Sequence, residues 1–288
     1  MKILLLGQHG QVSQELQHTL KEAGELTVLG RDQLDLTHAE LIRQSVLSHR
    51  PALIINAAAH TAVDQAEREP QLAFAINATA PGILAEVAAE LDVPLIHYST
   101  DYVFDGNQVE PYRESDTTNP LSVYGRSKLA GEQAIQAVGG MHLILRTSWV
   151  YSQHGRNFLL TMQRLLQERE TLNVVADQIG APTWAGSIAQ TTAQLIEHWR
   201  NGQAGPWGVY HLTALGETSW FGFAQAIAEH LQSQGKPVAT LHPIPSSAYP
   251  TPAQRPLNSR LNCRQLQQDW QLQLPTWQSA LGECLAAR

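Results

Sequence analysis

The chain has 288 residues, of which 43% are hydrophobic and 16% are charged, and its formal net charge at pH 7 is −7. That length suits one large α/β domain, or a core domain with a smaller lobe, and the negative charge gives little electrostatic support for a nucleic-acid partner. No HExxH motif or Cys/His ligand spacing predicts a zinc site, and two cysteines with a short apolar N-terminus favour a cytoplasmic protein without disulfides, signal peptide or membrane span.

Short apolar runs alternate with longer amphipathic stretches over the first 150 residues. Residues 2–7, KILLLG, predict a buried strand, and residues 11–24 predict a helix. Further along the chain we expect a strand at 25–30, a helix at 37–50 capped by Thr37, a strand at 52–59, a helix at 71–92 broken near Pro81-Gly82, a strand at 94–100, a helix at 124–139 and a strand at 142–151. This alternation predicts an α/β fold with a Rossmann-like, doubly wound parallel sheet.

The boundary between two domains is expected near residue 150. Residues 1–150 are interpreted as a dinucleotide-binding Rossmann domain, to which later segments could return. Residues 151–288 are interpreted mainly as a smaller C-terminal substrate-binding lobe, because their pattern is less regular. Prolines cluster at 243–256, the most loop-like stretch of the chain.

The first strand and helix are joined by GQHGQVS, in which Gly7, Gly10 and Ser13 are three residues apart. Glycines at such a turn let the backbone approach a pyrophosphate, whose charge is stabilised by the helix N-terminus. Ser13 stands where the GxGxxG pattern has its third glycine, and it adds a side chain where helix and sheet pack closely. The alternative is a plain strand-to-helix turn.

The second strand ends at Gly30-Arg31, where an NAD-preferring site usually has an acid that binds the ribose 2′-hydroxyl. The missing acid and the available cation favour NADPH. Asp32 and Asp35 lie nearby, so NADH is kept as the alternative cofactor. The alternative role for Arg31 is a solvated surface charge.

Two later strand ends carry polar residues. INAAAHTAVD, residues 55–64, combines small side chains that leave room for a flat ligand with His60 and Thr61 at the rim. On this motif alone, a helix start capped by Thr61 is the preferred interpretation. HYSTDYVFDG, residues 97–106, places Thr100 and Asp101 at a strand end, where doubly wound sheets carry active sites. The alternative there is a polar loop with an Asp-Gly turn.

Tyr124 and Lys128 are four residues apart on a predicted helix and therefore share a face. A lysine ammonium near a tyrosine hydroxyl favours the phenolate and lowers the tyrosine pKa from its usual value of about 10. Tyr124 would then give a proton to a carbonyl near neutral pH. YxxxK occurs often by chance, but it is far more specific when it follows a glycine turn and a strand end that bears Ser or Thr.

Together, Gly7-x-x-Gly10, Thr100 and Tyr124-x-x-x-Lys128 resemble the extended short-chain dehydrogenase/reductase superfamily. Longer strings narrow the resemblance to the dTDP-4-dehydrorhamnose reductase family: INAAAHTAVDQAE, HYSTDYVFDG, YGRSKLAGE, LRTSWVY, DQIGAPT, GVYHLTALGETSW and YPTPAQRPLNSRLN. They cover nearly the whole chain. The resemblance implies NAD(P)H-dependent reduction of the C4 ketone of dTDP-4-dehydro-L-rhamnose to dTDP-L-rhamnose, the last step of dTDP-rhamnose biosynthesis.

The resemblance also implies the roles of individual residues. Tyr124 would give the proton to the ketone oxygen, Lys128 would lower the pKa of Tyr124 and hold the nicotinamide ribose, and Thr100 would hydrogen-bond the same oxygen. The implied cofactor contacts are Gly7, Gly10, Gln11, Val12, Gly30, Arg31, Asp35, Leu36, Ala59, His60, Thr61, Tyr124 and Lys128. The implied substrate contacts are Thr100, Asp101, Trp149, Arg255 and Arg260. By residue chemistry alone, Trp149 would more often be core, and the two arginines could equally tie down the Pro-rich loop.

Some members of the family hold Mg²⁺ with acidic residues at a dimer contact. Glu15 could match one of these residues, but Gly186 and the CLAAR end offer no partners. The metal question, and the choice between a monomer and a homodimer, are therefore left open.

Three other functions are weighed against the reductase. A related nucleotide-sugar 4-ketoreductase could give another stereochemistry, such as 6-deoxy-L-talose. A non-catalytic regulatory subunit of the same fold is disfavoured because Thr100, Tyr124 and Lys128 are all present. An epimerase or dehydratase is disfavoured because Asp101 is followed by Tyr102 and not by a second acid.

Overall fold

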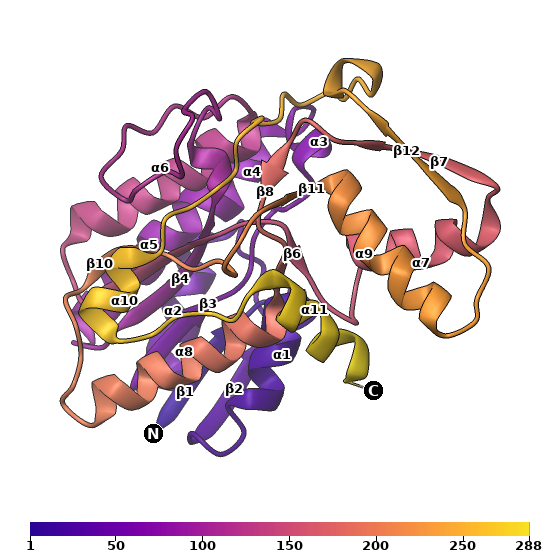
Figure 1. Cartoon of the computed structure of the whole chain (residues 1–288). Coiled ribbons are helices and arrows are strands. Elements are labelled where there is room, and N and C mark those ends of the chain that lie inside the picture. Colours follow the sequence, from indigo (N-terminus) through magenta and orange to yellow (C-terminus); the bar gives the residue numbers. More distant parts are fainter. Residues whose placement is uncertain (288) are drawn as a thin grey trace.

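A six-stranded sheet in the order β10-β5-β4-β3-β1-β2 forms the centre of the computed structural model, which describes residues 1–287 (Figure 1). Every neighbouring pair of these strands is parallel. The predicted α/β fold with a parallel, Rossmann-like sheet is therefore confirmed. The strands are β1 (Lys2–Leu6), β2 (Glu25–Leu29), β3 (Leu53–Asn56), β4 (Leu95–Thr100), β5 (His142–Thr147) and β10 (Gly208–His211).

Helices cover both faces of this sheet. Ile3 and Leu5 of β1 pack into the apolar cluster under α1 and α8, whereas Leu4 and Leu6 pack into the cluster under α2, α5 and α6. Because both faces are buried, the strands read as continuous apolar runs. The covering helices are α1 (Gln11–Thr19), α2 (Ala39–His49), α5 (Ala80–Glu90), α6 (Val123–Val138) and α8 (Ala185–Arg200).

A smaller lobe lies beside the sheet, on the right of Figure 1. Its helices α7, α9 and α11 share a separate apolar core. Both β10 and α8 follow residue 150 in sequence yet belong to the sheet layers, so the later half of the chain is divided between the two parts. The lobe and its connections comprise β6 (Val150–Tyr151), α7 (Phe158–Glu168), β7 (Thr171–Val175), β8 (Ile179–Gly180), β9 (Thr183–Trp184), β11 (Thr218–Ser219), α9 (Trp220–Ser233), β12 (Thr240–Ile244), η3 (Ser246–Ala248) and α11 (Trp277–Ala286). Helix α10 (Arg264–Trp270) instead packs beside β10 and adds Leu266 and Trp270 to the core of the sheet.

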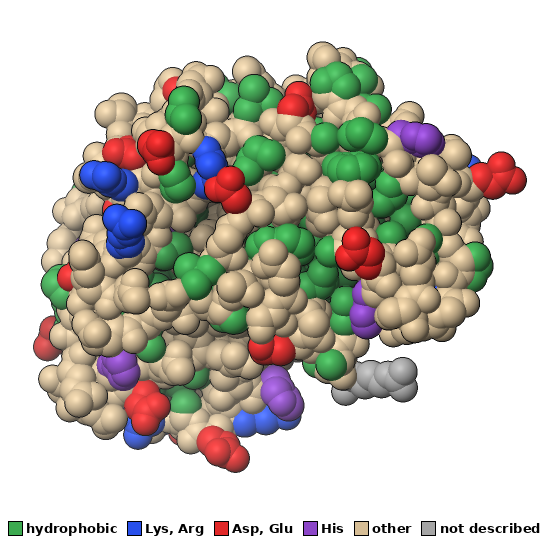
Figure 2. Space-filling view, viewed as in Figure 1, with side chains coloured by type: hydrophobic (Ala, Val, Ile, Leu, Met, Phe, Trp, Pro, Cys, Tyr) green, Lys and Arg blue, Asp and Glu red, His purple; other side chains and the backbone are tan. Residues whose placement is uncertain are grey.

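Acidic and basic side chains are interspersed on the face drawn in Figure 2. The molecule therefore presents mixed charge on this face, in keeping with a net charge of −7. Both cysteines, Cys263 and Cys284, are free thiols.

Two predicted helix caps are wrong. Helix α2 begins at Ala39 and has His38 as its N-cap, without a side-chain cap. Thr37 instead donates its hydroxyl to Asp35 Oδ1 at 2.8 Å, which closes a local turn before the helix. Thr61 likewise does not cap α3 (Val63–Ala66), whose N-cap is Ala62.

The expected break at Pro81-Gly82 is also wrong, because the helix runs without interruption from α4 (Pro70–Phe74) through η1 (Ala75–Thr79) into α5. The irregularity lies one turn earlier: η1 is a turn of π-helix. Pro81 has no N–H with which to bond the carbonyl of Asn77, so a widened turn before Pro81 accommodates the missing bond. The packing there is close, since a Cβ on Gly131 of α6 would lie 2.0 Å from Asn77 O.

The same segment, Pro70–Glu90, is long and apolar enough to cross a membrane, by length and composition only. The sequence was expected to hold no run of that kind. In the structure α5 packs between α2 and α6 and buries Leu84 and Val87 completely. Its hydrophobicity is therefore used in covering the sheet, as in the core helix of a globular protein.

Candidate active site

The site is organised around the start of α6, which carries Tyr124 and Lys128. Ser122 caps this helix by accepting a hydrogen bond from Gly125 N at 3.1 Å. A Cβ on Gly125 would lie 2.2 Å from Tyr102 O, so only glycine lets the helix approach the end of β4 this closely. The approach places the rings of Tyr102 and Tyr124 edge to face, with their centroids 5.5 Å apart.

Thr100 and Asp101 lie where β4 ends and η2 (Asp101–Val103) begins, as predicted for a strand end. Thr100 Oγ1 donates to Asp101 Oδ1 at 3.0 Å and accepts from Tyr102 N at 3.2 Å. Asp101 is buried, its Oδ2 has no hydrogen-bond partner among the described residues, and burial raises its pKa to about 6. A buried carboxyl oxygen without a partner is costly in a protein interior and suits a contact with a ligand.

The prediction that Lys128 lowers the pKa of Tyr124 is not met in the unliganded chain. Burial of the hydroxyl raises the pKa of Tyr124, and a hydrogen bond with Thr100 only partly opposes that rise. Lys128 Nζ is turned to β4, where it donates to Tyr98 O at 2.6 Å and lies 3.1 Å from His97 Nε2. Burial lowers the pKa of Lys128 to about 8. Tyr124 is therefore held as a neutral phenol next to Thr100.

The glycine turn fits an anionic group. Gly7 has φ 104° and a Cβ there would lie 2.8 Å from Ala58 N, so no other residue fits without a backbone shift. Gly10 is the N-cap of α1, and the first turn of that helix has neither a side-chain cap nor an acidic residue. The amide groups of Gln11, Val12 and Ser13 thus open the helix, where a pyrophosphate would be stabilised.

Ser13 and Gln11 show how the turn departs from the glycine pattern. Ser13 is fully buried, and Gln17 Nε2 bonds its hydroxyl at 3.4 Å. Gln11 Oε1 accepts from Asn157 Nδ2 at 2.8 Å, which links the turn to the start of α7. A serine in the third position is accommodated by this local network.

Gly30 and Arg31 lie at the end of β2. Gly30 N donates to Gln33 Oε1 at 2.8 Å, and a Cβ at position 30 would lie 2.6 Å from Gln8 Oε1. An acidic side chain at this position would displace Gln8. Arg31 is exposed, Leu36 is half-buried, and hydrogen bonds from Thr37 lower the pKa of Asp35.

A buried asparagine that the sequence reasoning missed fixes the backbone after β3. Asn77 Oδ1 accepts from His60 N at 2.8 Å, and Asn77 Nδ2 donates to His60 O at 3.0 Å and to Ser127 Oγ at 3.0 Å. Its amide thus joins the Ala59-His60-Thr61 segment to α6. The signal in the sequence was a lone asparagine in an otherwise apolar helix.

Trp149 interrupts the predicted strand 142–151. β5 ends at Thr147, Trp149 has φ 48°, and the chain continues in β6, which pairs with β9. The left-handed backbone turns the indole onto Trp220, 3.7 Å away between ring centroids and nearly parallel at 10°. A Cβ on Gly180 would lie 2.6 Å from Trp149 Cε2, so a glycine is needed beside the ring. Trp220 was not predicted, because only the fold brings α9 to this point.

The two arginines proposed for the diphosphate are held by acids. Arg255 Nη2 pairs with Asp64 Oδ2 at 3.0 Å, while its buried Nε has no partner among residues 1–287. Arg260 Nη1 pairs with Glu217 at 2.9 Å, its Nε donates to Asn258 Oδ1 at 2.9 Å, and its Nη2 donates to Val109 O. Arg255 lies in the Pro-rich segment, so its ion pair ties that segment to α3, while its Nε retains a free donor. The three partners of Arg260 all lie outside the Pro-rich segment.

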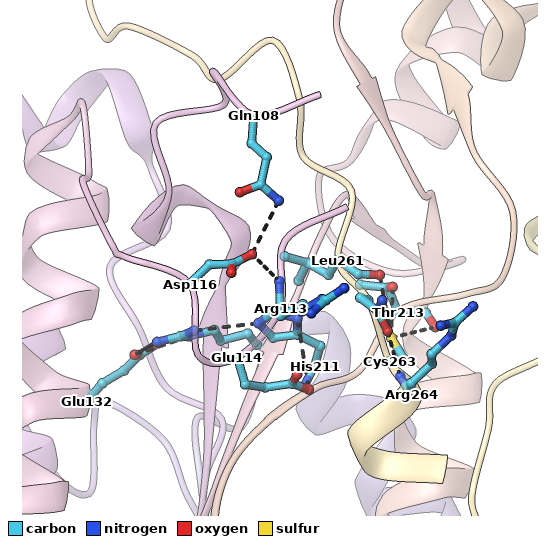
Figure 3. Close-up of polar contacts among 12 residues, drawn as sticks. Gln108, Arg113, Glu114, Asp116, Glu132, His211, Thr213, Leu261, Cys263 and Arg264 are labelled. Carbon is cyan, nitrogen blue, oxygen red and sulfur yellow. Dashed lines mark hydrogen bonds and ion pairs between the residues drawn. The ribbon is translucent and has the colours of Figure 1, made fainter. Parts of the chain in front are cut away.

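A buried ion pair braces α6 against the sheet. Arg146 of β5 donates to Glu132 of α6 from Nη2 at 2.6 Å and from Nε at 3.0 Å, and Ser99 Oγ donates to the same carboxylate. Figure 3 shows this contact continuing to His211 and to Glu114, which accepts from His211 N at 2.9 Å. The network anchors the loop after β4 and the helix that carries Tyr124 on the same strands.

In residues 1–287, no group of three or more His, Cys, Asp or Glu side chains is placed to hold a metal ion. Burial raises the pKa of Glu15, and the nearby His154 and His18 oppose that rise. Within residues 1–287, Glu15 therefore belongs to no cluster of three or more such side chains.

A family model described as the RmlD substrate binding domain matches residues 1–288. The chain is 48% identical to dTDP-4-dehydrorhamnose reductase of Escherichia coli K12 over 291 residues, covering 99% of this chain and 97% of the relative. It is 46% identical to the protein of the same name from Burkholderia thailandensis, covering 99% and 98%. A crystal structure of dTDP-4-dehydrorhamnose reductase from Bacillus anthracis in complex with NADP superposes with a TM-score of 0.92 at 34% identity, covering 100% of both chains.

Proposed function

The chain belongs to the RmlD family, whose relatives named above are dTDP-4-dehydrorhamnose reductases, and from this premise we propose the reaction that it catalyses. It is an NAD(P)H-dependent oxidoreductase that reduces the C4 ketone of dTDP-4-dehydro-L-rhamnose to dTDP-L-rhamnose. The observation that carries this function is the convergence of Thr100, at the end of β4, with the first turn of α6, where Gly125 lets Tyr124 approach that strand end and Lys128 follows one turn later. The regulatory-subunit alternative is disfavoured because that set is intact.

The residues of this chain divide the work of the reduction. When bound, the reduced nicotinamide supplies the hydride that adds to C4. Tyr124 gives its hydroxyl proton to the developing alkoxide, and its raised pKa means that the proton is present at neutral pH. Thr100 orients that hydroxyl, and the unpaired Asp101 Oδ2 is available to a sugar hydroxyl. Lys128 holds the nicotinamide ribose.

The glycine turn, the open N-terminus of α1 and the Asn77-fixed segment at 59–61 fit a dinucleotide. We propose NADPH as the preferred form, with Gly7, Gly10, Gln11 and Val12 on the pyrophosphate. Asp35 and Leu36 lie by the adenine, and Ala59, His60 and Thr61 line the cofactor. The NADP complex of the B. anthracis relative and the exposed Arg31 support this preference.

Replacing Arg31 with alanine is expected to raise the KM for NADPH roughly tenfold, because a guanidinium on the 2′-phosphate contributes a charge-assisted hydrogen bond. The KM for NADH is expected to stay within about twofold, since NADH has no phosphate there. Steady-state rates with each cofactor measure the two values. Arg164→Ala serves as the control, because it removes an exposed arginine whose one ion pair within residues 1–287 is with Glu168. Equal changes for both cofactors would contradict a role for Arg31 at the phosphate.

The substrate is proposed to lie between the end of β4 and the lobe, with its diphosphate near Arg255. We expect the edge of the Trp149 ring to contact the sugar nucleotide. Trp220 covers one face of this ring, and Gly180 lies against it as well. Arg260 is proposed as a second substrate contact, which would compete with its bonds to Glu217, Asn258 and Val109. The reaction is placed in the cytoplasm, with the protein acting as a monomer or a homodimer.

Replacing Gly180 with alanine is expected to raise the KM for the dTDP-sugar about tenfold, with the Kd for NADPH unchanged. The new Cβ would meet Trp149 Cε2 at 2.6 Å, so the ring must leave its stack on Trp220, which is worth about 1 kcal/mol. Loss of near-ultraviolet circular dichroism from the paired indoles reports the displacement directly. Gly282→Ala is the matched control, because a Cβ there meets no described atom within 4 Å. An unchanged KM together with an altered spectrum would remove Trp149 from the substrate site.

The function is tested by following loss of NADPH absorbance with dTDP-4-dehydro-L-rhamnose. Oxidation that depends on this sugar, and is faster with NADPH than with NADH, is expected. Cofactor binding without oxidation would favour the regulatory-subunit alternative or another sugar.

A further inference from the structure

Lys128 ends among buried polar groups of β4. The side chain is 2% exposed, and its Nζ has two partners among the described residues, Tyr98 O at 2.6 Å and His97 Nε2 at 3.1 Å. An ammonium carries three hydrogens and no lone pair, whereas an amine carries two hydrogens and one lone pair. The role of His97 in this contact therefore depends on the proton of Lys128.

His97 is paired with Asn56 on the neighbouring strand. The two residues are register partners between β3 and β4, and His97 Nδ1 lies 3.0 Å from Asn56 Nδ2. Asn56 Oδ1 accepts from Ala58 N at 3.2 Å, which fixes the amide with its nitrogen toward the ring. His97 Nδ1 must then accept, so the single hydrogen of a neutral ring sits on Nε2 and is donated to Lys128 Nζ. This set of bonds is complete only when Lys128 is an amine.

Protonating Lys128 reverses the contact. The ammonium can only donate, so His97 Nε2 must accept and the ring hydrogen must move to Nδ1. Nδ1–H would then face the amide nitrogen of Asn56, and the amide has to turn over to present its oxygen, giving up the bond from Ala58 N. In total, one proton from solvent converts an amine beside an Nε2–H ring into an ammonium beside an Nδ1–H ring.

We propose that His97 is a positioning residue for the reduction, whose ring changes tautomer as Lys128 gains or loses its proton, with the Asn56 amide turning over between the two states. Lys128 then keeps its hydrogen bond to His97 in both protonation states and stays in place beside Tyr124. This role rests on the proposed function of Lys128, and it assigns a purpose to a buried histidine that the reaction itself does not use.

Of the titratable groups near Lys128, His97 is the one whose hydrogen bond to Nζ must change when Lys128 gains or loses a proton. Glu132, one turn along α6, favours the ammonium, but its carboxylate is shared with Arg146 of β5 and Ser99 of β4. Two of the other titratable groups on elements packed against α6 already have partners: Asp64 of α3 pairs with Arg255, and the Tyr98 hydroxyl of β4 bonds Thr192. The remaining ones are Asp101 and Tyr102 in η2, His142 at the start of β5, and the exposed Glu86 and Glu90 of α5. Segments α4 and η1 contribute none.

The two groups titrate in the required order. Burial and the charge of Lys128 hold the pKa of His97 well below its usual range, so the ring stays neutral while it changes tautomer. Burial lowers the pKa of Lys128 to about 8, which brings its titration into a range that the folded protein can be taken through.

The proposal is tested by nuclear magnetic resonance on unliganded protein with ¹⁵N-labelled histidine, recording ring nitrogens between pH 6 and pH 10. His97→Gln identifies the His97 signals among the 12 histidines. The ring is expected to carry its hydrogen on Nδ1 at the low end and on Nε2 at the high end, with a midpoint near pH 8 set by Lys128. One unchanged tautomer across this range would overturn the proposal, as would an imidazolium signal.

His211 is the internal control. It is also buried, burial lowers its pKa to about 3, and its Nε2 lies 3.5 Å from Arg146 Nη1, a donor that does not titrate in this range. It should keep the Nδ1–H form throughout. In Lys128→Met, the His97 ring is expected to hold the Nε2–H form at every pH. A pH-dependent switch that survives in this variant would assign the transition to another group. Because the readout needs neither substrate nor turnover, it can fail while the reductase function stands, and the reverse.

Discussion

Tyr124→Phe is expected to lower kcat about 10³-fold while leaving the Kd for NADPH within about twofold. The hydroxyl is the proton donor, and general acid catalysis by a positioned side chain contributes roughly 10²–10⁴-fold. The ring itself is kept, so its edge-to-face contact with Tyr102 and the start of α6 are preserved. Single-turnover rates with saturating sugar, together with cofactor titrations by fluorescence, separate the chemical step from binding.

The matched control is Tyr151→Phe. Tyr151 is also buried, and its hydroxyl has no hydrogen-bond partner among the described residues, but it lies in the core of the smaller lobe. Its loss should leave kcat unchanged. Should Tyr124→Phe retain more than about a tenth of the wild-type rate, the proton would have to come from elsewhere, and Asp101 would be the first group to examine.

Arg146→Met is expected to cost about 3–5 kcal/mol of unfolding free energy. It removes the partner of Glu132, which is fully buried, and an uncompensated carboxylate in the protein interior is strongly destabilising. The stacking of the guanidinium over Phe104, at 5.1 Å, is lost as well. Urea unfolding at pH 7, followed by circular dichroism, measures the change.

Two further variants serve as controls for this predicted loss of stability. Arg164→Met breaks an exposed ion pair with Glu168 and should cost under about 0.5 kcal/mol. The double variant Glu132→Leu/Arg146→Met removes both charges and should recover most of the lost stability, because no buried charge is left unpaired. A cost below about 1 kcal/mol for the single variant would mean that water reaches Glu132.

Most strands of the central sheet could be predicted from the sequence, because strands that are buried on both faces have continuous apolar sequences. The same holds for the placement of Thr100, Tyr124 and Lys128, which depends on strand ends and on the spacing of residues along one helix. Local signals of this kind survive without knowledge of long-range contacts.

The mispredicted elements are mostly those whose backbone conformation depends on residues that are distant in the sequence. Trp149 breaks its strand by adopting a left-handed backbone against Gly180 and Trp220, neither of which is near it in sequence. The proline at 81 was expected to break a helix that instead absorbs it through a π-turn packed on Gly131. The cap misassigned to Thr37 reflects local hydroxyl bonding that competes with capping. Thr61 was misassigned because α3 has Ala62 as its N-cap.

The polar interior is the part that no spacing could reveal. Asn77 acts through its hydrogen bonds to a backbone segment 17 residues away in the sequence. His97 acts through its contacts with Asn56 on the neighbouring strand and with Lys128 on α6. Each of these residues reads in isolation as an ordinary polar residue within an apolar element. Residues such as Asn77 and His97, which support the site from behind, can therefore be identified only when strand register and helix packing are known.

The most direct test of the assigned reaction is the product itself. The protein is incubated with dTDP-4-dehydro-L-rhamnose and NADPH deuterated at the transferable position, and the sugar is read by proton nuclear magnetic resonance. Deuterium at C4 of dTDP-L-rhamnose is the expected result, and Tyr124→Phe should slow its appearance about 10³-fold. Deuterium at C4 of the talo epimer, or no transfer while NADPH still binds, would contradict the assigned reaction.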